Sequence, residues 1–255
     1  MNAIKHQLQF LLKDYIIKDD HLQLSSPFRV ILPNNSVVWV RICSCKSEKC
    51  SCGTRVNSQI LTYGKGLDFI PDIVFNGEIK IDNRLVFLSC TKQFNKIDSY
   101  LLNIEDAEIL GKALAWLHSI EPDKIFPLEK VLERTNKHII HADIFTDNLA
   151  HGENGLMLTD FADSHLGEPI IDFIGLMALN YNFEDGHLAV LKSYKDHICF
   201  DFEWPLASDL MTQAEIEIKN RINRRLKHNI PIDSQYISNL KIIYEQKITA
   251  YKKWL

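Results

Sequence analysis

The sequence reads I-I-H-A-D-I-F-T-D-N over residues 139–148 and G-L-M-L-T-D-F over residues 155–161. The first stretch is an apolar strand followed by a loop in which His141, Asp143 and Asn148 form a His-x-Asp-x-x-x-x-Asn pattern. The second stretch is another apolar strand, and it ends in an Asp-Phe pair twelve residues beyond the asparagine. A loop between two short strands can bring such polar side chains within reach of one site, although they are separated in the sequence.

Carboxylate and amide side chains in this order suit one kind of chemistry. Phosphoryl transfer needs one carboxylate to accept a proton from the attacking hydroxyl or to orient it, and an amide and a second carboxylate to hold Mg²⁺ on a triphosphate. Asp143, Asn148 and Asp160 provide that set. Taken singly, each acid would be a turn or capping residue and His141 a buried core histidine. The ordered series favours the phosphotransfer interpretation.

Two flanking stretches extend the pattern: L-G-K-A-L-A-W-L-H at residues 110–118 and G-E-P-I-I-D at residues 167–172. With the loop between them, residues 83–179 resemble the aminoglycoside phosphotransferase and choline kinase branch of the protein-kinase-like superfamily. The resemblance implies an α+β fold of the bilobal protein-kinase-like type, with a β-rich N-lobe and a mainly helical C-lobe. It also implies Asp143 as the catalytic base or hydroxyl-positioning group.

The same resemblance assigns roles to the other polar residues of this region. Asn148 and Asp160 would be Mg²⁺ ligands. His141 would orient the loop through hydrogen bonds and packing, and Asp172 would brace the loop backbone. A protein kinase is disfavoured because Ala162 replaces the Gly of Asp-Phe-Gly, and neither Ala-Pro-Glu nor a Gly-x-Gly-x-x-Gly motif is present where it is needed. A small-molecule acceptor is therefore expected.

Hydrophobic periodicity and turn residues predict the same organisation. Strands are expected at residues 21–24, 28–32 and 37–43 in an antiparallel meander, followed by a weak helix over 55–63, an extended stretch at 70–75 and a strand over 83–90. A helix over residues 103–120 opens with Asn103 as its N-cap. The final helix carries one apolar stripe, formed by Ile237, Leu240, Tyr244, Ile248, Tyr251 and Leu255. We expect residues 1–90 to form the nucleotide-binding N-lobe, and residues 91–255 the C-lobe with the catalytic loop, the metal site and the substrate-binding helices.

The nucleotide site is less clearly marked. By the resemblance, Arg41 takes the place of the phosphate-binding Lys; the alternative is a solvent-facing strand Arg. The acid that pairs with this Lys would fall near Val56 or Asn57, and neither is acidic. A loop formed by Ser25, Ser26 and Pro27 would cover the phosphates. Backbone groups around Ser89, Cys90 and Thr91 would bind the base.

Four of the six cysteines form a C-x-C-x₄-C-x-C cluster: Cys43, Cys45, Cys50 and Cys52. Four thiolates can surround Zn²⁺ in a structural site, although the spacing is tighter than usual. The alternative is a turn with alternating buried and exposed thiols.

Charge and composition exclude other classes. The 29 Lys and Arg against 33 Asp and Glu give a net charge of -4, so neither nucleic acid nor a membrane surface is an expected partner. We expect a cytoplasmic protein, because no leader peptide or membrane-spanning run is evident. Residues 160–209 hold ten acids and two lysines, which would attract a cationic acceptor or form a solvated face. The basic residues between 219 and 227 are expected to be solvated.

The sequence therefore predicts a kinase that uses ATP or GTP and Mg²⁺ to phosphorylate a hydroxyl of a small cationic molecule, such as an aminoglycoside or an amino alcohol. Antibiotic resistance, choline-like metabolism and self-protection would share this signature. The alternatives are a nucleotide-binding pseudokinase that regulates a partner, and a protein kinase.

Overall fold

The computed structural model describes residues 28–32, 35, 37–43, 52–81, 84–92, 94–96, 101–127, 131–132, 137–227 and 231–255. The chain divides into two compact units. Unit 1 takes its residues from 1–96, 121–135 and 150–164, and unit 2 from 97–120, 136–149 and 165–255. This division differs from a single boundary at residue 90, because two later segments return to unit 1. The assignment of nucleotide binding to residues 1–90 and of catalysis to residues 91–255 stays a prediction.

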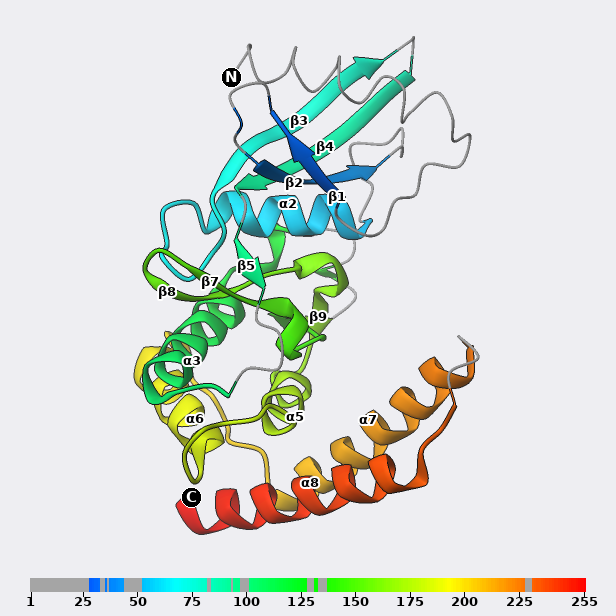
Figure 1. The fold of residues 1–255 in the computed structure, drawn as a ribbon. Helices are drawn as coiled ribbons and strands as arrows, with labels where there is room; N and C mark the ends of the chain where they lie inside the picture. Colours follow the sequence, from blue (N-terminus) through cyan, green and yellow to red (C-terminus); the bar gives the residue numbers. More distant parts are fainter. Residues whose placement is uncertain are drawn as a thin grey trace. The chain divides into compact units, whose positions relative to one another are not determined.

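Unit 1 is built on a four-stranded antiparallel sheet with the order β1-β2-β4-β3 (Figure 1). The strands are β1 (Phe28–Ile31), β2 (Val37–Cys43), β3 (Ile73–Ile81) and β4 (Arg84–Lys92). The expected antiparallel pairing of the strands over 28–32 and 37–43 is confirmed, whereas the strand expected over 21–24 lies outside the described residues. β4 inserts between β2 and β3, an order that local sequence patterns do not specify.

Alternation along the strands separates the two faces of this sheet. The apolar face holds a buried cluster made of Val30, Leu32, Val38, Val40, Ile42, Phe75, Ile79, Val86, Leu88 and Cys90. The opposite face carries Trp39 and Arg41 of β2, which pair in register with Thr91 and Ser89 of β4. Helix α2 (Gly53–Tyr63) lies along the sheet (Figure 1). It includes the weak helix expected over 55–63.

Two polar contacts attach α2 to β3. Arg55 pairs with Glu78 at 3.0 Å and lies 4.5 Å from the centroid of the Phe87 ring. Ser58 donates a hydrogen bond to Asn76. Because both partners are on one strand, the contacts set the rotation of the helix and direct Asn57 towards the face that carries Arg41.

A second, three-stranded sheet in unit 1 has the order β5-β7-β8. Its strands are β5 (Asn95–Lys96), β7 (Leu149–Gly152) and β8 (Gly155–Leu158). Gly155 has a φ of 115° in the tight β7–β8 turn, a conformation that favours glycine. β8 leads directly into Thr159, Asp160 and the short 3-10 helix η3 (Phe161–Asp163).

Unit 2 is mainly helical. Its helices are α3 (Ile104–Ser119), α5 (Ile170–Met177), α6 (Gly186–His197), α7 (Ala207–Lys227) and α8 (Ser234–Trp254), and a short antiparallel pair joins β6 (His138–Ile140) to β9 (His165–Gly167). Helix α3 opens with the expected cap: the Asn103 side chain accepts from Asp106 N at 2.9 Å, and Asp106 accepts from Asn103 N at 3.1 Å. No described helix has the length and apolarity needed to span a membrane.

The apolar stripe of α8 is confirmed in its centre. Leu240, Tyr244, Ile248 and Tyr251 are buried, whereas Leu255 beyond the end of the helix is 59% exposed. Helix α7 lies beside α8 as its antiparallel neighbour (Figure 1).

Helices α3 and α6 approach most closely at Gly111. A Cβ added there would meet the Val190 carbonyl and lie 2.8 Å from Tyr194 N, and both are backbone atoms that side-chain rotation cannot move. We predict that Gly111→Ala lowers the free energy of unfolding by about 1–3 kcal/mol, although Ala is the better helix former. Urea unfolding measures the change. The control is Glu108→Ala on the exposed face of the same helix, expected within about 0.5 kcal/mol of the wild type. Equal midpoints for the two variants would contradict close packing at this position.

Candidate active site

The loop that follows β6 is held by its backbone. Asp172, on α5, accepts hydrogen bonds from His141 N at 2.7 Å and from Ala142 N at 2.8 Å. Ala142 has a φ of 66°, in the left-handed region that non-glycine residues rarely adopt. The two hydrogen bonds to one carboxylate stabilise this conformation, so the chain turns sharply just before Asp143.

Asp172 is itself anchored in the core of unit 2. His118 of α3 lies 3.0 Å from Asp172 through Nε2 and 3.0 Å from the Tyr194 hydroxyl through Nδ1. A proton on Nε2 lets His118 donate to Asp172 while Nδ1 accepts from Tyr194 of α6. Burial alone would raise the pKa of Asp172, but the interactions with His118 and His141 outweigh it and hold that pKa below its usual range. An ionised carboxylate with several donors therefore lies under the loop.

The amide of Asn148 joins the two ends of the loop. Its Nδ2 donates to the Asp143 carbonyl at 2.8 Å and to Asp143 Oδ2 at 2.8 Å. Asn148 is 4% exposed, within the 3-10 turn η2 (Thr146–Asn148). With the NH₂ directed at Asp143, the Asn148 side-chain oxygen is the atom suited to a hard cation.

Helix α7 packs against the same loop. The Arg221 guanidinium lies 4.3 Å from the centroid of the Phe145 ring, donates to Glu217 at 2.7 Å and donates to the Tyr236 hydroxyl at 3.1 Å. The expectation that the basic residues of α7 are solvated is therefore wrong for Arg221. The spacing of the basic residues between 219 and 227 resembles that of an exposed charged face. Only the tertiary contact with Phe145 distinguishes Arg221 from the others.

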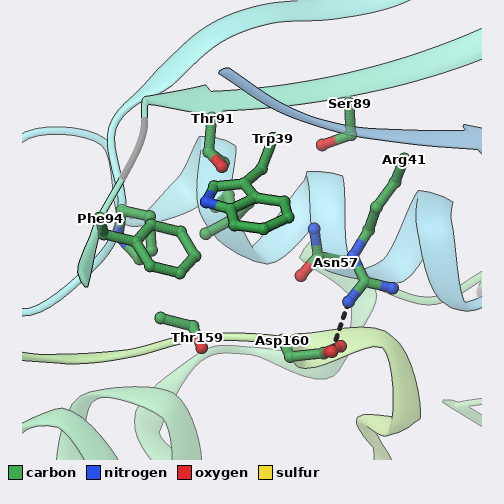
Figure 2. Close-up of a pocket in the computed structure, with 10 residues that line it drawn as sticks. Trp39, Arg41, Asn57, Ser89, Thr91, Phe94, Thr159 and Asp160 are labelled. Carbon is green, nitrogen blue, oxygen red and sulfur yellow. Dashed lines mark ion pairs between the residues drawn. The ribbon is translucent and has the colours of Figure 1, made fainter. Parts of the chain in front are cut away.

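Unit 1 contributes a pocket of its own (Figure 2). Its lining residues come from β2, α2, β4 and the segment after β8: Trp39, Arg41, Asn57, Leu61, Pro71, Ser89, Thr91, Phe94, Thr159 and Asp160. Figure 2 shows the Trp39 ring between Phe94 and Arg41, with Ser89 and Thr91 on one side and Thr159 and Asp160 on the other. The pocket has a cavity volume of about 30 Å³, far below that of a typical small-molecule site, because Trp39 fills it.

Arg41 and Asp160 form an ion pair in this pocket (Figure 2). Arg41 is 6% exposed, so it is not the solvent-facing strand residue considered as the alternative. Asp160 has a φ of 60°, and the next residue, Phe161, donates from its backbone N to Asn57 Oδ1 at 2.9 Å. An acid is absent at positions 56 and 57, and Asn57 instead holds the Asp-Phe segment.

Two polar atoms in the pocket point to a ligand. Trp39 Nε1 and Ser89 Oγ are buried without a hydrogen-bond partner. Such groups are normally satisfied in native proteins, and a bound polar molecule is one way to satisfy them. Both atoms belong to residues that line the pocket beside the Arg41–Asp160 pair.

The backbone of Ser89, Cys90 and Thr91, which was expected to bind the base, lies in the middle of the sheet. β4 pairs with β2 on one side and β3 on the other, so its backbone is used in the sheet rather than available to a base. The side chains of Ser89 and Thr91 line the pocket, whereas Cys90 lies in the apolar cluster on the other face. Burial raises the pKa of Cys90 to about 12, as expected for an inert core thiol.

The remaining predicted residues are only partly described. Ser25, Ser26, Cys45 and Cys50 lie outside the described residues. Over the part of the chain that the structure covers, no group of three or more His, Cys, Asp or Glu side chains could hold a metal ion. The zinc interpretation therefore has no support from the described cysteines.

Sequence reasoning missed the aromatic lining of the pocket. Trp39 and Phe94 have ring centroids 6.3 Å apart at an interplanar angle of 31°. Trp39 lies two residues before Arg41, so strand alternation could have placed it on the same face. No local signal connects Phe94 or Thr159 with that strand.

Solved structures of small-molecule phosphotransferases share the fold of this chain. Spectinomycin phosphotransferase APH(9)-Ia, solved with ADP and spectinomycin, has a TM-score of 0.56 at 10% identity, covering 90% of this chain and 89% of that one. Choline kinase LicA from Streptococcus pneumoniae has a TM-score of 0.52 at 13% identity, covering 98% and 99%.

A third structure, amicoumacin kinase hAmiN with AMP-PNP, Ca²⁺ and amicoumacin, has a TM-score of 0.54 at 12% identity, covering 97% of this chain and 95% of that one. No protein-family profile and no curated protein sequence matches this chain. At these identities the likeness establishes that the chain has the small-molecule kinase fold.

The bracing carboxylate provides a test of the loop. Because the folded-state pKa of Asp172 is lowered, its ionised form contributes stability above its unfolded pKa of about 3.9, and that contribution is lost as the pH falls through the folded pKa. We predict that Asp172→Asn lowers the free energy of unfolding by about 3 kcal/mol at pH 7. The difference from the wild type should narrow below about pH 4.

Urea unfolding at a series of pH values measures both effects. The control is Asp201→Asn, which changes an exposed carboxylate and should alter stability by less than about 0.5 kcal/mol. A pH-independent difference for Asp172→Asn would show that the ionised carboxylate does not brace the loop.

Proposed function

We propose that this protein is a Mg²⁺-dependent phosphotransferase that moves a phosphoryl group from ATP or GTP to a hydroxyl of a small molecule. The observation that carries the proposal is the Asp143–Asn148 pair, an acid and an amide joined at 2.8 Å in a loop braced by Asp172. The fold, which the chain shares with small-molecule phosphotransferases, supports it.

Asp143 is the group that receives the acceptor. Its side chain is half-buried, and the Asn148 amide fixes one of its carboxylate oxygens. A carboxylate held in one orientation can align a hydroxyl with the γ-phosphorus and take its proton as the bond forms. His141 is fully buried, and its backbone N donates to Asp172, so its proposed role is to orient the loop rather than to contact the substrate.

The donor set suits magnesium. Asn148 offers an amide oxygen and Asp160 a carboxylate, and both are hard ligands of the kind that Mg²⁺ prefers. The metal, when bound, screens the charge of the triphosphate. Asp160 forms an ion pair with Arg41 in the pocket of unit 1. The fork of Arg41 is suited to phosphate oxygens in place of the usual Lys.

The pocket of unit 1 suits a nucleobase. Trp39 offers an aromatic face for stacking, and Trp39 Nε1 and Ser89 Oγ are hydrogen-bonding groups without partners. Because the cavity is only about 30 Å³, a base can enter only if the Trp39 or Phe94 ring turns aside. Ser25 and Ser26 stay in the proposal as the loop over the phosphates.

The acceptor is proposed to be a cationic small molecule. Eight acids between residues 160 and 209 have exposed side chains outside the catalytic loop: Asp163, Glu168, Glu184, Asp185, Asp196, Asp201, Glu203 and Asp209. The matched structures include complexes with spectinomycin and amicoumacin, and a choline kinase. The test is transfer of the γ-phosphoryl group from labelled ATP and GTP to a panel of amino sugars, amino alcohols and basic peptide antibiotics.

A pseudokinase is the second candidate, and the Arg41–Asp160 ion pair favours it. A guanidinium on the metal-binding carboxylate and a pocket filled by Trp39 would suit a protein that binds nucleotide weakly or not at all. Nucleotide binding without turnover on any acceptor would favour this role, and label transfer to protein would favour a protein kinase.

We predict that Asp143→Asn reduces turnover by at least about 10³-fold and leaves nucleotide affinity unchanged, because the amide cannot take the hydroxyl proton. Steady-state kinetics and nucleotide titration measure the two effects. The matched control is Asp147→Asn, an exposed acid of the same loop that should keep its activity. Full turnover in Asp143→Asn would remove this residue from the mechanism.

We predict that Asp160→Ala weakens nucleotide binding at least about tenfold in the presence of Mg²⁺ and much less in its absence, because only the metal-bound nucleotide needs this carboxylate. Calorimetric titration with and without EDTA distinguishes the two conditions. Asp163→Ala, an exposed acid three residues further on, is the control. Equal losses in both conditions would indicate that Asp160 acts through Arg41 rather than through the metal.

A further inference from the structure

Two cysteines meet where β2 ends and α2 begins. Cys43 is the last residue of β2 and is buried, and Cys52 is the N-cap of α2 and is partly exposed. Their sulfur atoms lie 2.8 Å apart, and both are thiols in this structure. Two sulfur atoms at this distance need only small movements to form a disulfide bond.

A guanidinium acts electrostatically on both cysteines. Burial disfavours the charge of Arg55, but Glu78, Cys43 and Cys52 together outweigh it and raise the Arg55 pKa. Cys52 also stands at the amino end of α2, where its carbonyl accepts from Arg55 N at 2.9 Å and Val56 N at 3.1 Å. Positive charge beside a partly exposed sulfur is the environment in which reactive cysteines occur.

We propose that Cys43 and Cys52 form a reversible disulfide with a low-molecular-weight disulfide such as oxidised glutathione as the oxidant. The Cys52 thiolate attacks the glutathione disulfide, forms a mixed disulfide and releases one glutathione thiolate. The Cys43 thiolate then attacks the Cys52 sulfur, closes the protein disulfide and releases the second. The two protein thiols lose two electrons and two protons, and the oxidant gains them as two thiols.

The bond joins β2 and α2, two of the elements that line the pocket of unit 1. Cys43 is two residues beyond Arg41, and Cys52 is five residues before Asn57. Thr54 already connects the same elements through a hydrogen bond to the Ile42 carbonyl at 3.4 Å. Oxidation therefore fixes a contact that is present in the reduced protein, and it should stabilise the folded chain rather than distort it.

The two cysteines between the pair, Cys45 and Cys50, must be removed from the assay because they lie outside the described residues and share tryptic peptides with the pair. Trypsin cuts after Arg41, Lys46, Lys49 and Arg55, giving peptides 42–46 and 50–55. In the Cys45→Ser, Cys50→Ser variant, each peptide retains one cysteine. Oxidation with glutathione disulfide should give the two peptides as one linked species, lighter by two hydrogens and separated by dithiothreitol.

The same oxidation should raise the midpoint of thermal unfolding by several degrees, and dithiothreitol should reverse the rise. Adding Cys52→Ser to this variant should abolish both the link and the rise. Cys199, exposed in unit 2, is the internal control and should form only a mixed disulfide with glutathione.

Two results would overturn the proposal. One is glutathione retained on Cys43 or Cys52 in place of the link, which would show that the sulfurs do not reach each other. The other is one zinc ion per wild-type chain, released by a thiol reagent and measured with a chromogenic chelator, together with resistance to oxidation. That result would assign the pair to a metal site with Cys45 and Cys50.

Discussion

A single buried carboxylate, Asp172, holds the backbone of the loop after β6. An ion in the core of unit 2 is stable only if donors surround it, and His118, His141 N and Ala142 N provide them. These donors come from α3 and from the loop after β6, while Asp172 itself belongs to α5. The packing of α3 and α5, which are far from the loop in sequence, thus fixes the left-handed turn at Ala142 and the position of Asp143.

In unit 1, strand alternation and contacts between α2 and β3 orient the polar side chains. A pleated sheet sends alternate side chains to opposite faces, so one set of β2 residues builds the apolar cluster while Trp39 and Arg41 face α2. Contacts between α2 and β3 then orient Asn57, which binds the backbone next to Asp160. Position 57 carries an uncharged amide rather than an acid, and Arg41 forms its ion pair with Asp160. A metal or a nucleotide that binds at Asp160 would therefore meet this ion pair.

The likeness to solved kinases at 10–13% identity illustrates how little sequence the fold requires. A fold tolerates extensive substitution where hydrophobic patterning and total core volume are kept. Acceptor choice depends on surface groups that vary freely within such a fold.

The sequence by itself determined the features that depend on neighbours along the chain. The Asn103 N-cap of α3, the strands expected over 28–32 and 37–43, the centre of the α8 stripe and the order of His141, Asp143 and Asn148 were readable from the sequence, because periodicity and spacing encode them locally. The tertiary structure alone decided the insertion of β4 into the sheet, the pairing of Arg41 with Asp160 and the packing of Arg221 on Phe145. Those contacts join residues far apart in sequence, and their energy depends on burial and geometry that no local pattern records.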